Sequence, residues 1–166
     1  MPQLVALSVS IGLLGGLATI LYLKTGLLIW AGFIAWACYF HSGGNNNALM
    51  NTIVGNAFGS FCAWIAALII LSVPAGVVPA GIVVGLTVMA LCLAAHIKAF
   101  SVIPASVYGY AATFAYLLQT ADSMTKDKLL SASLGNALIL VIISMAIGAL
   151  FGMASGKLGG ALTAKT

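Results

Sequence analysis

Two asparagines stand where a polar side chain is least expected in this sequence. Asn56 and Asn136 each occupy a Gly-Asn-Ala triplet within a long apolar stretch. Because an amide both donates and accepts hydrogen bonds, a pair of amides suits a small neutral solute such as water, urea, an amide or ammonia. The same side chains could instead hydrogen-bond one helix to another. Both interpretations are open, and we take the two asparagines as the predicted polar lining of a solute path.

Four aromatic residues complete this predicted path. An overlay of two segments, described below, places Trp36 opposite Tyr110 and Phe40 opposite Phe114. Aromatic rings in such stretches usually pack in a core or anchor a helix at the membrane surface, and a minority of them form constrictions. The four rings are therefore candidates for the lining, with core packing as the alternative.

Side chains for catalysis or metal binding are scarce. Cys38 with His41, and Cys92 with His96, have helical spacing, so each pair would lie on one helix face. Together they could hold zinc only if the two helices met, and such spacing is unspecific. Thiols that pack as small apolar groups and histidines near the membrane surface explain them more simply. We predict no enzyme activity, no catalytic residue, no metal site and no cofactor.

The composition predicts the environment of these residues. Of 166 residues, 63% are hydrophobic and 5% are charged, and the mean hydropathy is +1.19. A soluble globular chain carries about 25% charged residues. Lys, Arg, Asp and Glu are all absent between Lys24 and Lys98, and six scattered lysines form no basic surface for nucleic acid. The sequence predicts an integral membrane protein whose partners are the lipid bilayer and a small-molecule solute.

Six apolar segments emerge when the chain is divided at charges, turns and polar clusters. We predict an all-α integral membrane protein with six transmembrane helices, since a span needs about 20 mostly apolar residues. The segments are residues 4–23, 27–40, 49–71, 81–97, 102–118 and 129–153. One transmembrane domain then covers residues 1–156, and a short basic tail covers residues 157–166.

An internal repeat relates the first three segments to the last three. The overlay of residues 9–40 on residues 83–114 pairs Lys24 with Lys98, and after an insertion the two Gly-Asn-Ala triplets coincide. Three spans that are repeated directly enter the membrane in opposite orientations, so the copies would be inverted repeats. A chance match between helices rich in Ala, Leu and Gly is the alternative. The predicted copies span residues 4–72 and 78–156.

Glycines spaced four apart predict close helix packing. Small residues at this spacing let two helix backbones approach where the hydrophobic effect supplies no drive between helices. The contacts could lie inside one protomer or between protomers, which makes a homo-oligomer plausible. The pairs are Gly12 with Gly16, Gly55 with Gly59, and Gly148 with Gly152.

The orientation follows from the termini. An even number of spans puts both termini on one side, and the lysines divide equally between the two sides. The free amino terminus and the two lysines of the tail favour a cytoplasmic location for both termini. The N-terminus lacks a positively charged region, so we predict that the first apolar segment is retained.

Three stretches resemble a known family. Residues 25–33 (TGLLIWAGF), residues 103–115 (IPASVYGYAATFA) and Phe151-Gly-Met153 resemble a family of small bacterial inner-membrane proteins known as a domain of unknown function. Pro104-Ala-Ser departs from the Pro-Gly of that family. The resemblance implies a six-span protein of the bacterial inner membrane and no established activity or site residues.

The predicted function is a channel or facilitator that passes a small neutral or weakly basic solute between the two repeats. Proton- or sodium-coupled carriers usually keep an ionisable residue at membrane depth, and none is expected here, so passive permeation fits better. Two alternatives remain: a secondary transporter that uses the carbonyls of a broken helix, and a structural or accessory membrane subunit without a path.

Overall fold

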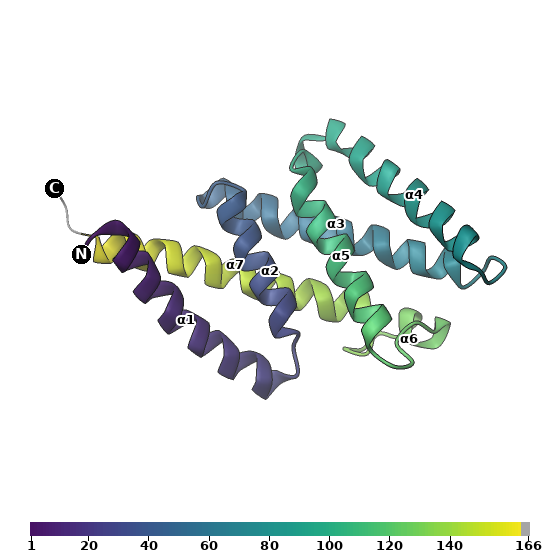
Figure 1. The fold of residues 1–166 in the computed structure, drawn as a ribbon, viewed down its shortest axis with the longest axis horizontal. Coiled ribbons are helices and arrows are strands. Elements are labelled where there is room, and N and C mark those ends of the chain that lie inside the picture. The colour runs from purple at the N-terminus through teal and green to yellow at the C-terminus, as the bar shows by residue number, and fades with distance from the viewer. Residues whose placement is uncertain (164–166) are drawn as a thin grey trace.

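The computed structural model describes residues 1–163, and every regular element in this range is helical (Figure 1). The predicted all-α fold is confirmed. Two 3-10 turns, Ala94–His96 and Lys98–Phe100, join α4 to α5. The α-helices are α1 (Gln3–Thr25), α2 (Ile29–His41), α3 (Asn46–Ile70), α4 (Val77–Leu93), α5 (Ile103–Gln119), α6 (Lys126–Leu130) and α7 (Ala137–Leu162).

Four of these helices are long and apolar enough to cross a membrane: α1, α3, α7, and α4 together with the turn that follows it. The two helices between them are shorter, with 13 residues in α2 and 17 in α5. At a rise of about 1.5 Å per residue, α2 and α5 extend about 20 and 26 Å. Each is shorter than the roughly 30 Å hydrocarbon core of a bilayer.

Helix ends fall where backbone chemistry favours them. Gly26 ends α1 in the left-handed region, with φ of 71°. Asn45 caps α3, because its side chain accepts a hydrogen bond from the backbone N–H of Ala48 at 2.9 Å. Pro79 lies in the first turn of α4, where a missing N–H is harmless. α4 therefore begins at Val77, four residues before the start of the predicted segment 81–97.

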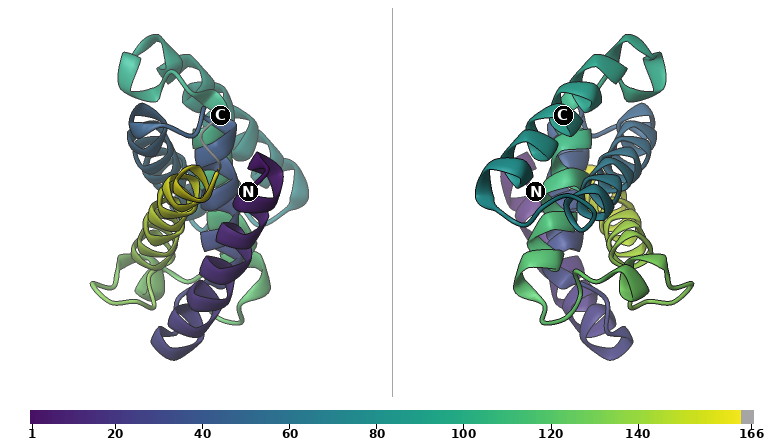
Figure 2. Two further views of the ribbon diagram at one scale, coloured as in Figure 1. Left: turned by 90° about the vertical axis from the view of Figure 1, so that its left-hand side faces the viewer. Right: turned by 90° about the vertical axis from the view of Figure 1, so that its right-hand side faces the viewer.

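The helices form a bundle with α2 and α5 side by side at its centre (Figure 1). Figure 2 shows α3 and α7 on one side of this central pair. α1 packs on α7 at one end of the molecule, and α4 packs on α3 at the other. Leu13 of α1 and Ile82 of α4 are more than half exposed, at 62% and 57%. Such apolar outer faces suit a lipid environment.

Two helix crossings bring backbone against backbone. At the α3–α5 crossing, a Cβ at Gly59 would overlap the carbonyl oxygen of Ser106, and a Cβ at Gly109 would overlap that of Asn56. At the α2–α7 crossing, a Cβ at Gly148 would overlap the carbonyl oxygen of Gly32. Glycine is required here by the close approach of the two helices.

The predicted packing glycines divide into two groups. Gly55, Gly59, Gly148 and Gly152 lie at the two crossings. Gly12 and Gly16 on α1 face outward instead, and no atom of the described chain lies within 4 Å of where their Cβ would be. Any contact that this pair makes is therefore with lipid or with another molecule.

The sixth predicted segment, residues 129–153, is interrupted. α6 ends at Leu130, and α7 begins only at Ala137. The residues between them, Ser-Ala-Ser-Leu-Gly-Asn, carry hydroxyl and amide groups that bond the backbone outside a helix, which breaks the apolar stretch. α7 then continues to Leu162, so the first part of the predicted tail is helical, and Lys165 lies outside the described residues.

We expect a single methyl group added at the α3–α5 crossing to destabilise the folded protein. Gly59→Ala should lower the free energy of unfolding by about 1–3 kcal/mol or more, because the two backbones must separate. Gly85→Ala on the exposed side of α4 is the matched control and should be neutral or stabilising by up to about 1 kcal/mol, since alanine favours a helix and no neighbouring helix or side chain lies within 4 Å of the added methyl group. Thermal unfolding in detergent, followed by tryptophan fluorescence, measures both. Equal losses for the two variants would contradict the packing at Gly59.

Candidate functional site

Three buried side chains on α3 and α5 have no hydrogen-bond partner. Thr52, Asn56 and Ser106, which we call the polar cluster, are 0%, 2% and 1% exposed. Within the described residues, both amide atoms of Asn56 and the hydroxyls of Thr52 and Ser106 have no oxygen or nitrogen partner, and the Thr52 hydroxyl faces the Cys38 thiol, which is a weak hydrogen-bonding group. Buried polar groups in native proteins are nearly always paired, so three unpaired neighbours need an explanation.

The glycine contacts bring the polar cluster together. Thr52 and Asn56 are four residues apart on α3 and so share one face of that helix. Gly55 and Gly59 lie on the same helix, and the α5 backbone at Ser106 rests directly against them. Close contact between the two backbones therefore places the Ser106 hydroxyl next to α3 and keeps other side chains out.

The unpaired groups carry an energetic penalty. A buried polar group without a partner costs about 1–3 kcal/mol. A ligand or water that bonds to these groups would recover that free energy. The buried polar residues of the described chain are serines, threonines and asparagines, none of them charged. Because nothing here compensates a charge, the site suits a neutral hydrogen-bonding molecule.

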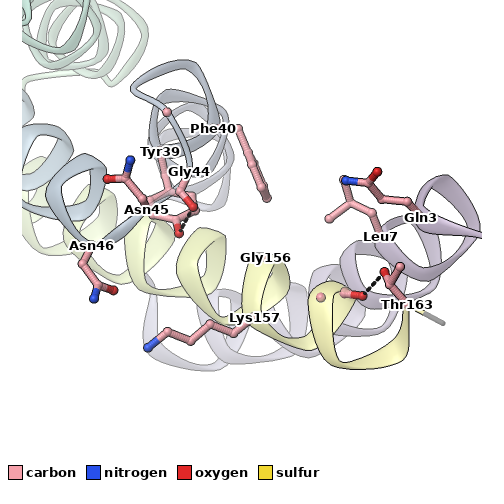
Figure 3. Close-up of a pocket in the computed structure, with 13 residues that line it drawn as sticks. Gln3, Leu7, Tyr39, Phe40, Gly44, Asn45, Asn46, Gly156, Lys157 and Thr163 are labelled. Carbon is pink, nitrogen blue, oxygen red and sulfur yellow. Dashed lines mark hydrogen bonds between the residues drawn. The ribbon is translucent and has the colours of Figure 1, made fainter. Parts of the chain in front are cut away.

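A cleft at one end of the bundle borders the start of α3, the helix that carries Thr52 and Asn56 of the polar cluster. This terminal pocket has a volume of about 560 Å³ and lies between the start of α1 and the ends of α2 and α7 (Figure 3). Gln3, Phe40 and Asn45 line it. Asn45 caps α3, and Asn56 lies about 16 Å further along that helix at 1.5 Å per residue.

Cys38 lies between the terminal pocket and the polar cluster. It neighbours Thr52, and its sulfur lies 3.9 Å from the Ser42 hydroxyl. Its neighbour in sequence, Tyr39, lines the terminal pocket and donates a hydrogen bond to the carbonyl oxygen of Gly44 at 2.7 Å. The thiol thus stands beside the polar cluster on the side of α2.

Asn136 is not a partner of Asn56. It caps α7: its side-chain oxygen accepts from the N–H of Leu138 at 3.0 Å. Its amide nitrogen donates to the carbonyl oxygens of Leu129 at 2.8 Å and Ser131 at 2.9 Å. The expectation that Asn136 lies within a long apolar helical stretch is wrong, because the sixth apolar stretch breaks immediately before it and Asn136 stands at the start of α7.

The four predicted aromatic residues are likewise dispersed. Trp36 is a core residue whose indole N–H donates to the Ser155 hydroxyl at 2.9 Å, and Phe151 stacks on its ring. The hydroxyl of Tyr110 shares a hydrogen bond with that of Thr87 on α4 at 2.8 Å. Phe40 reaches into the terminal pocket, whereas Phe114 borders an apolar cleft that Tyr110 also lines.

The sequence predicted one member of the polar cluster and missed two. Thr52 could have been found from its position one helical turn before Asn56. Ser106 could not, because only the fold brings α5 against α3. Residues 1–163 contain no group of three His, Cys, Asp or Glu side chains placed to hold an ion. His41 instead contacts the Tyr108 hydroxyl at 3.0 Å.

These features define a small, apolar, all-helical protein with an uncharged polar cluster sealed in its interior. The chain belongs to the family described as protein of unknown function (DUF1097), whose model matches residues 8–160. This match agrees with the resemblance noted in the sequence and supplies no activity. No curated protein and no solved structure matches the chain.

The two asparagines should respond oppositely to mutation. Asn136→Ala removes a helix cap and two donated bonds and should destabilise the protein by about 1–2 kcal/mol. Asn56→Leu removes an amide that has no partner, so stability should stay the same or rise. Chemical or thermal unfolding in detergent compares the variants with the parent. A loss for Asn56→Leu as large as that for Asn136→Ala would show that Asn56 has bonded partners after all.

Proposed function

We propose that this protein is a membrane facilitator for a small neutral solute, with the polar cluster as its binding point. The unpaired amide of Asn56 carries this proposal. An amide that served only to join helices would be bonded to its neighbours, as Asn136 is. Two hydroxyls beside the amide add donors and acceptors, which suits water, urea, a small amide or ammonia.

The surroundings of the cluster favour passive permeation. Coupled carriers usually keep a charged or ionisable group near the site that binds the driving ion. The buried polar residues of the described chain are all uncharged. A hydrogen-bonding site of this kind replaces the hydration of a solute without coupling its movement to an ion.

In this proposal the chain crosses the membrane six times as two inverted halves, α1–α3 and α4–α7. Helix packing supports it: α1 lies on α7 as α4 lies on α3, and α2 crosses α7 as α5 crosses α3. Figure 1 shows α1 and α4 running in opposite directions at opposite ends of the bundle. An exchange of the halves would preserve each of these contacts.

The glycine contacts also support this exchange of the halves. They align α3 with α7 in a different register from the one in which the two Gly-Asn-Ala triplets coincide. Gly148 lies against Gly32 as Gly59 lies against Ser106, and the sequence overlay pairs Gly32 with Ser106. Gly59 then corresponds to Gly148. Three residues earlier on each helix, Asn56 corresponds to Met145, so the binding point belongs to one of the two crossings only.

The proposed location is the bacterial inner membrane, with both termini in the cytoplasm. The terminal pocket, which Gln3 and Thr163 help to line, would then open on the cytoplasmic side. It would serve as a vestibule for a solute on its way to the polar cluster. The clefts elsewhere on the surface are apolar or border the ends of α5.

A structural or accessory membrane subunit is the second candidate. One observation favours it: the contact between the α3 and α5 backbones seals the polar cluster, and the terminal pocket does not reach Asn56. If the protein has no solute path, the polar cluster is a set of unpaired buried groups that binds no ligand. Solute flux separates the two candidates.

We also propose that the protein is a homo-oligomer whose subunits meet through the outer face of α1. The outward-facing pair Gly12 and Gly16 would allow close approach of a second copy. Gly12→Leu should dissociate the oligomer in mild detergent, whereas Val9→Leu, on the same exposed helix, should not. Native mass spectrometry measures the subunit number. A monomeric parent protein would contradict this interface.

Stopped-flow swelling of proteoliposomes tests the proposed function. The parent protein should pass at least one of water, urea, acetamide and ammonia faster than empty liposomes do. Asn56→Leu should reduce this flux by about tenfold or more, which corresponds to about 1.4 kcal/mol of lost stabilisation at the barrier.

The control for this experiment is Asn136→Ala, which should keep the parent flux per folded protein. Flux equal to that of empty liposomes for every solute would overturn the facilitator and favour the accessory subunit. Equal loss of flux in both variants would assign the effect to folding rather than to the polar cluster.

A further inference from the structure

The two equivalent helix crossings are bonded very differently. At the α2–α7 crossing, the N–H of Leu28 donates to the Ser144 hydroxyl at 3.0 Å, and the Tyr22 hydroxyl donates to the Ser144 carbonyl. Further along α7, the indole N–H of Trp36 donates to the Ser155 hydroxyl at 2.9 Å. Hydrogen bonds from both α1 and α2 therefore fasten α7, and these three helices form one tied unit.

Within the described residues, one weak side-chain hydrogen bond joins α3 to α5 at their crossing. The Ser60 hydroxyl donates to the Gly109 carbonyl at 3.2 Å, which is long for a hydroxyl donor. Thr113 donates to the same carbonyl at 2.9 Å, but that bond lies within α5. The remaining polar side chains at this crossing, those of the polar cluster, are unpaired. Separation of α5 from α3 would break the Ser60 bond and the backbone contacts at Gly59 and Gly109, and it would let water reach three dry groups. The hydroxyls of Tyr108 and Tyr110 bond α5 to His41 of α2 and to Thr87 of α4 rather than to α3.

α5 also has room to move. Apolar clefts of about 340 Å³ and 560 Å³ border it on the sides of α2 and α4, and Ala111 lines both of them. α5 is joined to α4 through an extended residue, Ile97, between two short turns, and Thr120 at its other end is also extended. Non-helical joints at both ends are where a helix can pivot.

We infer that α5 is the gate of this protein: it tilts away from α3 to admit water and solute to the polar cluster, while α1, α2 and α7 stay fixed. This inference rests on the proposed function for the role of the opening, although the movement itself can be measured without any solute. The closed contact described above is then the resting state. Only one of the two crossings opens.

A cross-link between α3 and α5 tests the gate. Ser60 and Thr113 are suitable positions, because their hydroxyls reach the same carbonyl oxygen from facing helices and neither belongs to the polar cluster. S60C and T113C are combined in a C62A/C92A background, so that Cys38, the neighbour of Thr52, is the remaining native thiol. Oxidation, or the shortest bifunctional thiol reagent, joins the pair.

A disulfide between S60C and T113C should abolish solute flux, and reduction of that disulfide should restore the flux. The lock should also slow the labelling of Cys38 by a small water-soluble thiol reagent by about tenfold or more, because the open population is removed. The control is S10C/S155C in the same background, which joins α1 to α7, where Ser10 donates to the Ser155 carbonyl at 2.7 Å. Because S155C also removes the hydroxyl that Trp36 bonds, the reduced form of this variant is the reference for its oxidised form. This lock should leave flux and labelling unchanged.

A wedge provides a second measurement that needs no cross-link. Gly109→Ala places a methyl group against the Asn56 carbonyl and should hold α5 away from α3, so the Cys38 of folded protein is labelled faster than in the parent. Gly85→Ala on α4, where no neighbouring helix or side chain lies within 4 Å of the added methyl group, is the control and should leave labelling unchanged.

The outcomes separate this inference from the proposed function. If no solute crosses the parent protein, the facilitator fails, and Cys38 labelling still decides whether α5 moves. If solute crosses and neither the α3–α5 lock nor the Gly109→Ala wedge changes labelling, the gate is wrong and the facilitator stands. If the α1–α7 lock slowed flux and labelling as much as the α3–α5 lock does, the gate would also be overturned, because the tied unit of α1, α2 and α7 would then move as well.

Discussion

Backbone contact between helices is the constraint on which the rest of this structure depends. Gly59 and Gly109 let α3 and α5 touch, and Gly148 with Gly32 does the same for α7 and α2. In an apolar environment the hydrophobic effect supplies no force between helices, so close approach of small residues must hold the bundle together. The same contact decides which side chains are enclosed, because no large residue fits at the crossings.

The enclosure gives one residue type two different roles. Both the oxygen and the nitrogen of the Asn136 amide are hydrogen-bonded at the break before α7, with partners at 2.8 to 3.0 Å. Asn56 has the same amide and no partner, because it lies in mid-helix where the backbone groups already bond one another. Its hydrogen-bonding capacity is therefore free for a molecule that is not part of the chain, and this is the physical basis of the function proposed.

The contrast between the two crossings extends this reasoning. Serines at the α2–α7 crossing are bonded to neighbouring helices, whereas those at the α3–α5 crossing are bonded weakly or not at all. A fold with two helix crossings can in this way keep one crossing fastened and leave the other able to open. In the gate that we infer, polar contacts rather than backbone shape distinguish the fixed helices from the moving one.

Composition and hydropathy by themselves determined the helical class, the apolar environment and the approximate positions of most helices. These properties depend on local runs of residues, which a sequence displays directly. The break at residues 131–136 was missed, because a short polar run inside an apolar stretch can end a helix or remain in it. Only the tertiary structure decided that Asn56 meets α5, that Asn136 does not meet Asn56, and that Ser106 joins the site. Which helix faces which depends on glycine contacts between distant segments, and a single sequence does not reveal the partner of a glycine.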